Sequence, residues 1–123
     1  MQATTTVTQR TATSASDKSV SVLAFSGDIS STSKEAILAA YHGLNGASSK
    51  VLLDFSGVDY INSSGIAIII QMLLEASKTG SRTIAIFGLS PHFQKVFTMV
   101  GINKYAVLHA NEAAALTTLY DTN

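Results

Sequence analysis

The stretch that decides the fold is residues 51–74, VLLDFSGVDYINSSGIAIIIQMLL. Residues 50–55 are mostly apolar, which is typical of a buried strand, and a short polar turn then leads to Ser63 and Ser64. A very apolar helix is predicted over residues 66–78 and is expected to stop at Gly80. A strand followed directly by a helix indicates an α/β domain, with the two serines at the junction.

The rest of the chain repeats this alternation. Further strands are predicted at residues 19–25, 83–87 and 105–109, and further helices at residues 33–44, 91–100 and 112–120. The helix at 33–44 is expected to start with a capping box of Thr32 and Glu35 and to stop at Asn45 and Gly46. The pattern predicts one α/β domain, a mixed β-sheet with alternating helices packed on it.

The N-terminal segment differs in composition from the rest. Residues 1–17 are rich in threonine and serine, so we expect either a flexible leader or an edge strand around residues 5–10. Residues 18–123 are expected to form the single domain.

Composition excludes several classes of protein. Eight basic and eight acidic side chains cancel, and only 13% of residues are charged, so the chain lacks the basic field that nucleic-acid binding needs. No cysteine is present, the N-terminus lacks the apolar core of a signal peptide, and no apolar run approaches the ~20 residues that span a bilayer. We expect a cytoplasmic protein without membrane insertion.

Catalytic motifs are also missing from the sequence. The segment INSSGIA lacks the first glycine of a G-x-S-x-G elbow, and no phosphate-binding glycine motif occurs. His42, His92 and His109 fall on three different predicted elements, without the spacing of a zinc site. We therefore expect no enzyme, no catalytic residue, no cofactor and no metal.

The serine turn remains as the candidate site. Ser63 is predicted to be the N-cap of the following helix, a purely structural role if nothing else is present. Gly65 lies in the first helical turn, where alanine would be more favourable by about 1 kcal/mol, so close approach of another group is expected there. At 100° per residue, Ile69 and Leu73 point to the core with Ile66 and Ile70, and Ile68 points to solvent beside Ser64. An exposed isoleucine beside two serines predicts a docking patch.

Several segments together resemble one family. The stretch VLLDFSGVDYINSSGIAII is similar to the signature of the STAS domain, the fold of bacterial anti-sigma factor antagonists. FSGDISSTSKEAIL, FGLSPHFQKVFTMVGINKY and HANEAAALTTL resemble further segments of that family, in the same order. The resemblance covers residues 18–120, almost the whole chain.

The resemblance implies a regulatory role. In such proteins the first serine of the motif, here Ser63, is phosphorylated by a partner that is both an anti-sigma factor and a serine kinase. The unphosphorylated antagonist binds that partner, the phosphorylated form releases it, and a serine phosphatase resets the cycle. The implied partner-binding residues are Asn62, Ser63, Ser64, Gly65 and Ile68.

Two positions depart from the family pattern. Asn62 stands where phosphorylated members commonly have aspartate, and Ser30 stands where an aspartate often closes the G-x-(hydrophobic)-D segment. Both differences remove negative charge near Ser63. They leave open an alternative: a non-switching STAS scaffold, or an accessory subunit of a signalling or transport assembly, in which the serines only cap the helix.

Overall fold

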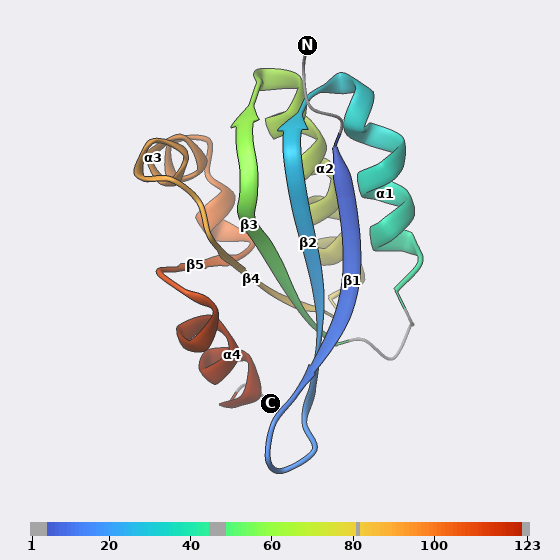
Figure 1. Ribbon diagram of the computed structural model, residues 1–123, viewed down its shortest axis with the longest axis vertical. Coiled ribbons are helices and arrows are strands. Elements are labelled where there is room, and N and C mark those ends of the chain that lie inside the picture. The colour runs from blue at the N-terminus through green and yellow to red at the C-terminus, as the bar shows by residue number, and fades with distance from the viewer. Residues whose placement is uncertain (1–4, 45–48, 81, 122–123) are drawn as a thin grey trace.

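One mixed sheet forms the centre of the molecule (Figure 1). The computed structural model describes residues 5–44, 49–80 and 82–121. The strands lie in the order β1-β2-β3-β4-β5; their bounds are β1 Thr6–Thr13, β2 Ser19–Ile29, β3 Lys50–Ile61, β4 Thr83–Phe87 and β5 Val107–His109. β1 and β2 form an antiparallel hairpin, whereas all later neighbours are parallel. The predicted α/β class with a mixed sheet is confirmed.

Helices cover both faces of the sheet. They are α1 Lys34–His42, α2 Ser63–Thr79, α3 Pro91–Met99 and α4 Glu112–Asp121. Side chains of α1, α2 and α3 share one core with one face of the strands, while α4 packs on the other face. Figure 1 shows α1 and α2 side by side, with α3 and α4 on the opposite side of the view. No described helix is long and apolar enough to cross a membrane.

The central strands are apolar on both sides because both sides are covered. In β2, Leu23 and Phe25 pack against α1, α2 and α3, whereas Val20 and Val22 pack against α4. The ring of Phe25 stacks on Phe55 of β3 at 4.9 Å. This is the continuous apolar pattern expected of parallel strands buried on both faces. The sheet is therefore a rigid support for the turns at its ends.

The strand before the serines is longer than predicted. β3 continues to Ile61 and α2 begins at Ser63, so a single residue separates strand from helix. Residues 56–60 look like a turn in the sequence, but after irregularities in register they still pair with β2, placing Tyr60 opposite Asp28. At this irregularity the Asp54 carboxylate accepts hydrogen bonds from the Ser56 N–H (2.8 Å) and hydroxyl (2.6 Å). Pairing with β2 explains why polar residues there remain extended.

The predicted capping box of Thr32 and Glu35 is wrong. A 3-10 turn, Ser31–Ser33, precedes α1, so the chain starts to wind earlier than predicted. The reciprocal hydrogen bonds join Ser30 and Ser33 instead: the Ser30 N–H donates to the Ser33 hydroxyl, and the Ser33 N–H donates to the Ser30 carbonyl, both at 2.9 Å. The helix ends at His42 with Gly43 as its C-cap, whereas the residues predicted to stop it, Asn45 and Gly46, lie outside the described residues.

The threonine-rich segment is a strand where the structure describes it. Thr6–Thr13 forms β1 at the edge of the sheet, and Val7 packs against the main core. Just before it, the Thr5 hydroxyl donates to the Asp28 carbonyl at 2.6 Å. The start of β1 is thus attached to the end of β2, beside the serine turn. Residues 1–4 lie outside the described part of the chain.

Candidate partner-binding site

The site is built on the single residue that joins β3 to α2. Asn62 is the N-cap of α2; its side-chain oxygen accepts a hydrogen bond from the Gly65 N–H at 2.9 Å. Its own N–H donates to the Ile29 carbonyl at 3.1 Å, which prolongs the pairing of β3 with β2. The prediction that Ser63 is the N-cap is therefore wrong, and Ser63 is the first helical residue. β3 ends at Ile61 and the helix begins at Ser63, so the cap position falls on Asn62, one residue earlier than predicted.

Both serines are presented to solvent. Ser63 and Ser64 occupy the first two positions of α2, and both are exposed, while Asn62 is half-buried. Because Asn62 performs the capping, the Ser63 hydroxyl is not needed to hold the helix start. Two adjacent exposed hydroxyls at a rigid helix start are accessible to another protein's active site.

At Gly65 the backbone of α2 approaches the end of β2 closely. A Cβ at this position would lie 2.5 Å from the Ile29 carbonyl oxygen and 2.9 Å from two other Ile29 atoms. The close approach expected from the sequence therefore exists, but it is made by the fold and not by a partner. Because residue 65 is glycine, the start of α2 with its two serines can pack directly against the end of β2.

The prediction that Ile68 is exposed is wrong. Ile68 is only 6% exposed and belongs to the main core, and Met72, one turn further along the helix, is fully buried. The buried positions of α2 are Gly65, Ile68, Ile69, Met72, Leu73 and Ala76. The contact of Gly65 with Ile29 turns this side of the helix inward, leaving Ile66 and Ile70 half-buried. Of the five predicted partner-binding residues, Gly65 and Ile68 are thus inaccessible.

Other exposed residues around the serines were not singled out from the sequence. Tyr60, 53% exposed, lies at the end of β3 and makes an edge contact with Phe93 of α3, with ring centroids 6.0 Å apart. Ser31 and Thr32 are exposed on the turn that follows β2. The exposure of Tyr60 could have been predicted from strand alternation, because Ile61 faces the core and its neighbour in an extended strand must face away. The parallel pairing of β2 and β3 brings both turns to the same end of the sheet (Figure 1).

The site has little charge. The first turn of α2 contains no acidic residue, and none of residues 60–74 is charged. Glu75 is the first charge along the helix and pairs with His42 of α1 at 2.7 Å. Within the described residues, no group of three or more histidine or carboxylate side chains is placed to hold a metal ion.

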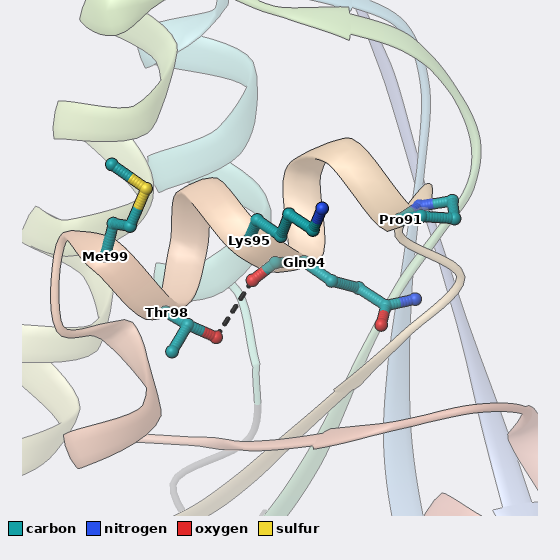
Figure 2. Close-up of a pocket in the computed structure, with 5 residues that line it drawn as sticks. All are labelled: Pro91, Gln94, Lys95, Thr98 and Met99. Carbon is teal, nitrogen blue, oxygen red and sulfur yellow. Dashed lines mark hydrogen bonds between the residues drawn. The ribbon is translucent and has the colours of Figure 1, made fainter.

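A separate hollow lies on the outer side of α3, away from the two serines in sequence and on a different helix. Figure 2 shows the residues that line it, Pro91, Gln94, Lys95, Thr98 and Met99. The Thr98 hydroxyl donates to the Gln94 carbonyl at 2.9 Å, and Met99 is 83% exposed. Among the five residues that line the hollow, Lys95 has the one charged side chain. The hollow does not combine groups that could activate a nucleophile.

Removing the cap should weaken the start of α2. We expect Asn62→Ala to lower the free energy of unfolding by about 1 kcal/mol, because the Gly65 N–H loses its acceptor. Asn62→Ser should restore most of the loss, since serine is an equally good cap. Urea unfolding of the three proteins measures this. Equal stability of Asn62→Ala and the wild-type protein would contradict the capping role.

Comparisons with known proteins now decide the family. A family model described as "Mlab, STAS domain" matches residues 12–110, most of the chain. The chain belongs to the STAS-domain family. The matched region runs from the hairpin to the end of β5 and contains the whole serine turn. A comparison with curated protein sequences found no match.

Solved structures agree on the fold. An anti-sigma factor antagonist from Mycobacterium paratuberculosis matches with a TM-score of 0.74 and 20% identity, over 94% of this chain and 96% of that chain. The Bacillus cell fate determinant SpoIIAA in its phosphorylated form matches with a TM-score of 0.62 and 19% identity, over 90% and 98%. The mouse anion transporter Slc26a9 matches with a TM-score of 0.74 and 13% identity, over 95% of this chain but 22% of the transporter. At these identities the likeness concerns the fold.

Proposed function

We propose that this STAS-domain protein is an anti-sigma factor antagonist that works by partner switching in the cytoplasm. Unphosphorylated, it binds an anti-sigma factor that is also a serine kinase; phosphorylated on Ser63, it releases that kinase until a serine phosphatase removes the phosphate. The protein itself is not an enzyme in this scheme. Ser63 is the substrate of its partner's active site.

One observation carries the proposal: Ser63 is exposed, its hydroxyl does not cap the helix, and the first turn of α2 has no charged side chain. Asn62 caps α2, so modification of the Ser63 hydroxyl does not remove a structural hydrogen bond. A phosphate brings about −1.5 to −2 charges to a first turn that has no acidic residue. The helix N-terminus tolerates that charge, whereas an apolar or acidic partner surface does not.

The relatives give the proposal its biological setting. The Mycobacterium protein is an anti-sigma factor antagonist, and the Bacillus protein SpoIIAA was solved both phosphorylated and unphosphorylated. Those properties belong to the relatives. For this chain they are part of the proposal.

Phosphorylation can be tested directly. Incubation with an anti-sigma factor kinase from the same organism and ATP should add one phosphate, which mass spectrometry should assign to Ser63. Ser63→Ala should abolish the labelling and Ser64→Ala should retain it. Labelling of Ser63→Ala at the wild-type rate would show that the site is elsewhere.

A second candidate function follows from the transporter match. Because the fold also occurs as about a fifth of an anion transporter, the chain is alternatively a non-switching scaffold or accessory subunit of a transport or signalling assembly. In that case a charge at Ser63 has no particular effect on partner binding.

Neighbouring aspartate substitutions distinguish the two functions. Ser63→Asp should abolish binding of the partner that the unphosphorylated wild-type protein binds. Ser64→Asp adds the same charge one residue later and should weaken this binding much less. Co-purification followed by titration calorimetry measures both. If Ser63→Asp binds like wild type, the scaffold function is favoured.

A further inference from the structure

Asn62, the N-cap of α2, is directly followed by Ser63, the proposed site of phosphorylation. We propose that Asn62, as an uncharged cap, allows the first turn of α2 to hold a phosphate on Ser63 as a dianion. The inference rests on the proposed phosphorylation of Ser63 and concerns how that state is maintained. It assigns Asn62 a role in regulation and not in partner contact.

Three hydrogen bonds hold Asn62 in place next to Ser63, one through its side chain and two through its main chain. Its amide oxygen accepts from the Gly65 N–H (2.9 Å), its N–H donates to the Ile29 carbonyl (3.1 Å), and its carbonyl accepts from the Ile66 N–H (2.9 Å). The side chain cannot turn away without losing the cap. Whatever charge residue 62 carries is therefore fixed beside the phosphoserine.

Aspartate would satisfy the same cap but with a negative charge. Asparagine and aspartate are about equally good N-caps, so the hydrogen bond alone does not select between them. The difference appears when Ser63 carries phosphate. Coulomb's law gives about 0.7 kcal/mol of repulsion between two unit charges ~6 Å apart in water, which is roughly half a pKa unit. A carboxylate at residue 62 should therefore raise the second phosphate pKa by an amount of this order.

The helix start acts in the opposite direction. The first N–H groups of a helix and its macrodipole favour negative charge, and in α2 no acidic side chain in the first turn already satisfies them. When residue 62 is neutral, no carboxylate at the cap counteracts this attraction between the helix start and the phosphate. The attraction should lower the second pKa of phosphoserine from its ordinary value of about 6 by roughly half a unit.

Few other titratable groups lie on the elements that meet at this end of the sheet. Asp28 of β2 pairs in register with Tyr60 of β3, and both face away from α2, because Ile29 and Ile61 face the core beneath it. Further such groups are Lys34 and Glu35 at the start of α1, Asp59 in β3 and His92 at the start of α3. All of them are the same in wild type and in residue-62 variants. A comparison of those variants therefore isolates the charge at 62.

The experiment installs phosphoserine at residue 63 by genetic incorporation, so it needs neither the kinase nor the partner. The second pKa is measured by phosphorus NMR titration in the folded protein and in the same protein unfolded in urea. We expect the folded value to be about half a unit lower than the unfolded value. We expect Asn62→Asp to raise the folded value by at least about half a unit, and Asn62→Ser, a neutral cap, to leave it low.

Phosphoserine at Ser77 is the matched control. Ser77 is exposed near the other end of α2, about 21 Å from residue 63 along the helix and beyond the Debye length, so its pKa should not respond to Asn62→Asp. Circular dichroism melts verify that each variant is folded. An unchanged phosphate pKa in Asn62→Asp, or an equal rise in Asn62→Ser, would overturn the inference. Because the phosphate is introduced during translation, failure of kinase labelling does not affect this result.

Discussion

Replacing Gly65 with alanine is expected to destabilise the protein by about 2–3 kcal/mol, although alanine is the better helix former by about 1 kcal/mol. The new Cβ would lie 2.5 Å from the Ile29 carbonyl oxygen. That oxygen is a backbone atom and already accepts the Asn62 N–H, so it cannot move without disrupting the end of β2. Urea unfolding followed by circular dichroism measures the loss.

Gly80→Ala serves as the control for Gly65→Ala. Gly80 ends α2 with φ +63°, and a Cβ there meets nothing within 4 Å, so the substitution costs only about 1 kcal/mol of backbone strain. A Gly65→Ala protein as stable as wild type would mean that α2 does not approach β2 as closely as described.

Truncating Phe97 is expected to cost about 3–5 kcal/mol. The residue is fully buried on α3, and its ring meets Phe55 of β3 edge-on at 5.7 Å between centroids. Phe97→Ala removes that contact and leaves a cavity between helix and sheet. A loss of this size is a large fraction of the 5–15 kcal/mol typical of a domain. Thermal and urea unfolding should both show it.

Met99→Ala provides the comparison on the same helix. Met99 is 83% exposed, so its truncation should change stability by no more than about 0.5 kcal/mol. Similar losses for Phe97→Ala and Met99→Ala would contradict the packing of α3 on the sheet.

The fold could be predicted because its strands and helices differ clearly in pattern. The strand at 83–87 is found with the predicted bounds, and α3 begins at Pro91 as predicted, with the Ser90 hydroxyl accepting the Phe93 N–H as its cap. The polar end of β3 could not be predicted in the same way. Its extended form depends on pairing with β2, and residues 56–60 lack the apolar pattern that signals a strand.

The candidate site was predicted in position but not in orientation. Ser63 and Ser64 are exposed at the start of α2, but the face assigned to Ile68 was wrong. Every side chain in residues 63–70, the first half of this helix, is apolar or small, so periodicity alone does not fix which side of it is buried. The contact between Gly65 and the Ile29 backbone decides it, and a contact between distant residues is not visible in a helical pattern.

The most direct test of the proposed switch compares two states of one protein. The affinity of the captured anti-sigma factor kinase is measured by titration calorimetry for the chain with serine and with phosphoserine at residue 63; phosphoserine at residue 77 is the control. We predict binding at least about a hundredfold weaker with phosphate at 63, since a fixed charge is added to the uncharged start of α2, and little change with phosphate at 77. Equal affinity for serine and phosphoserine at residue 63 would contradict the switch.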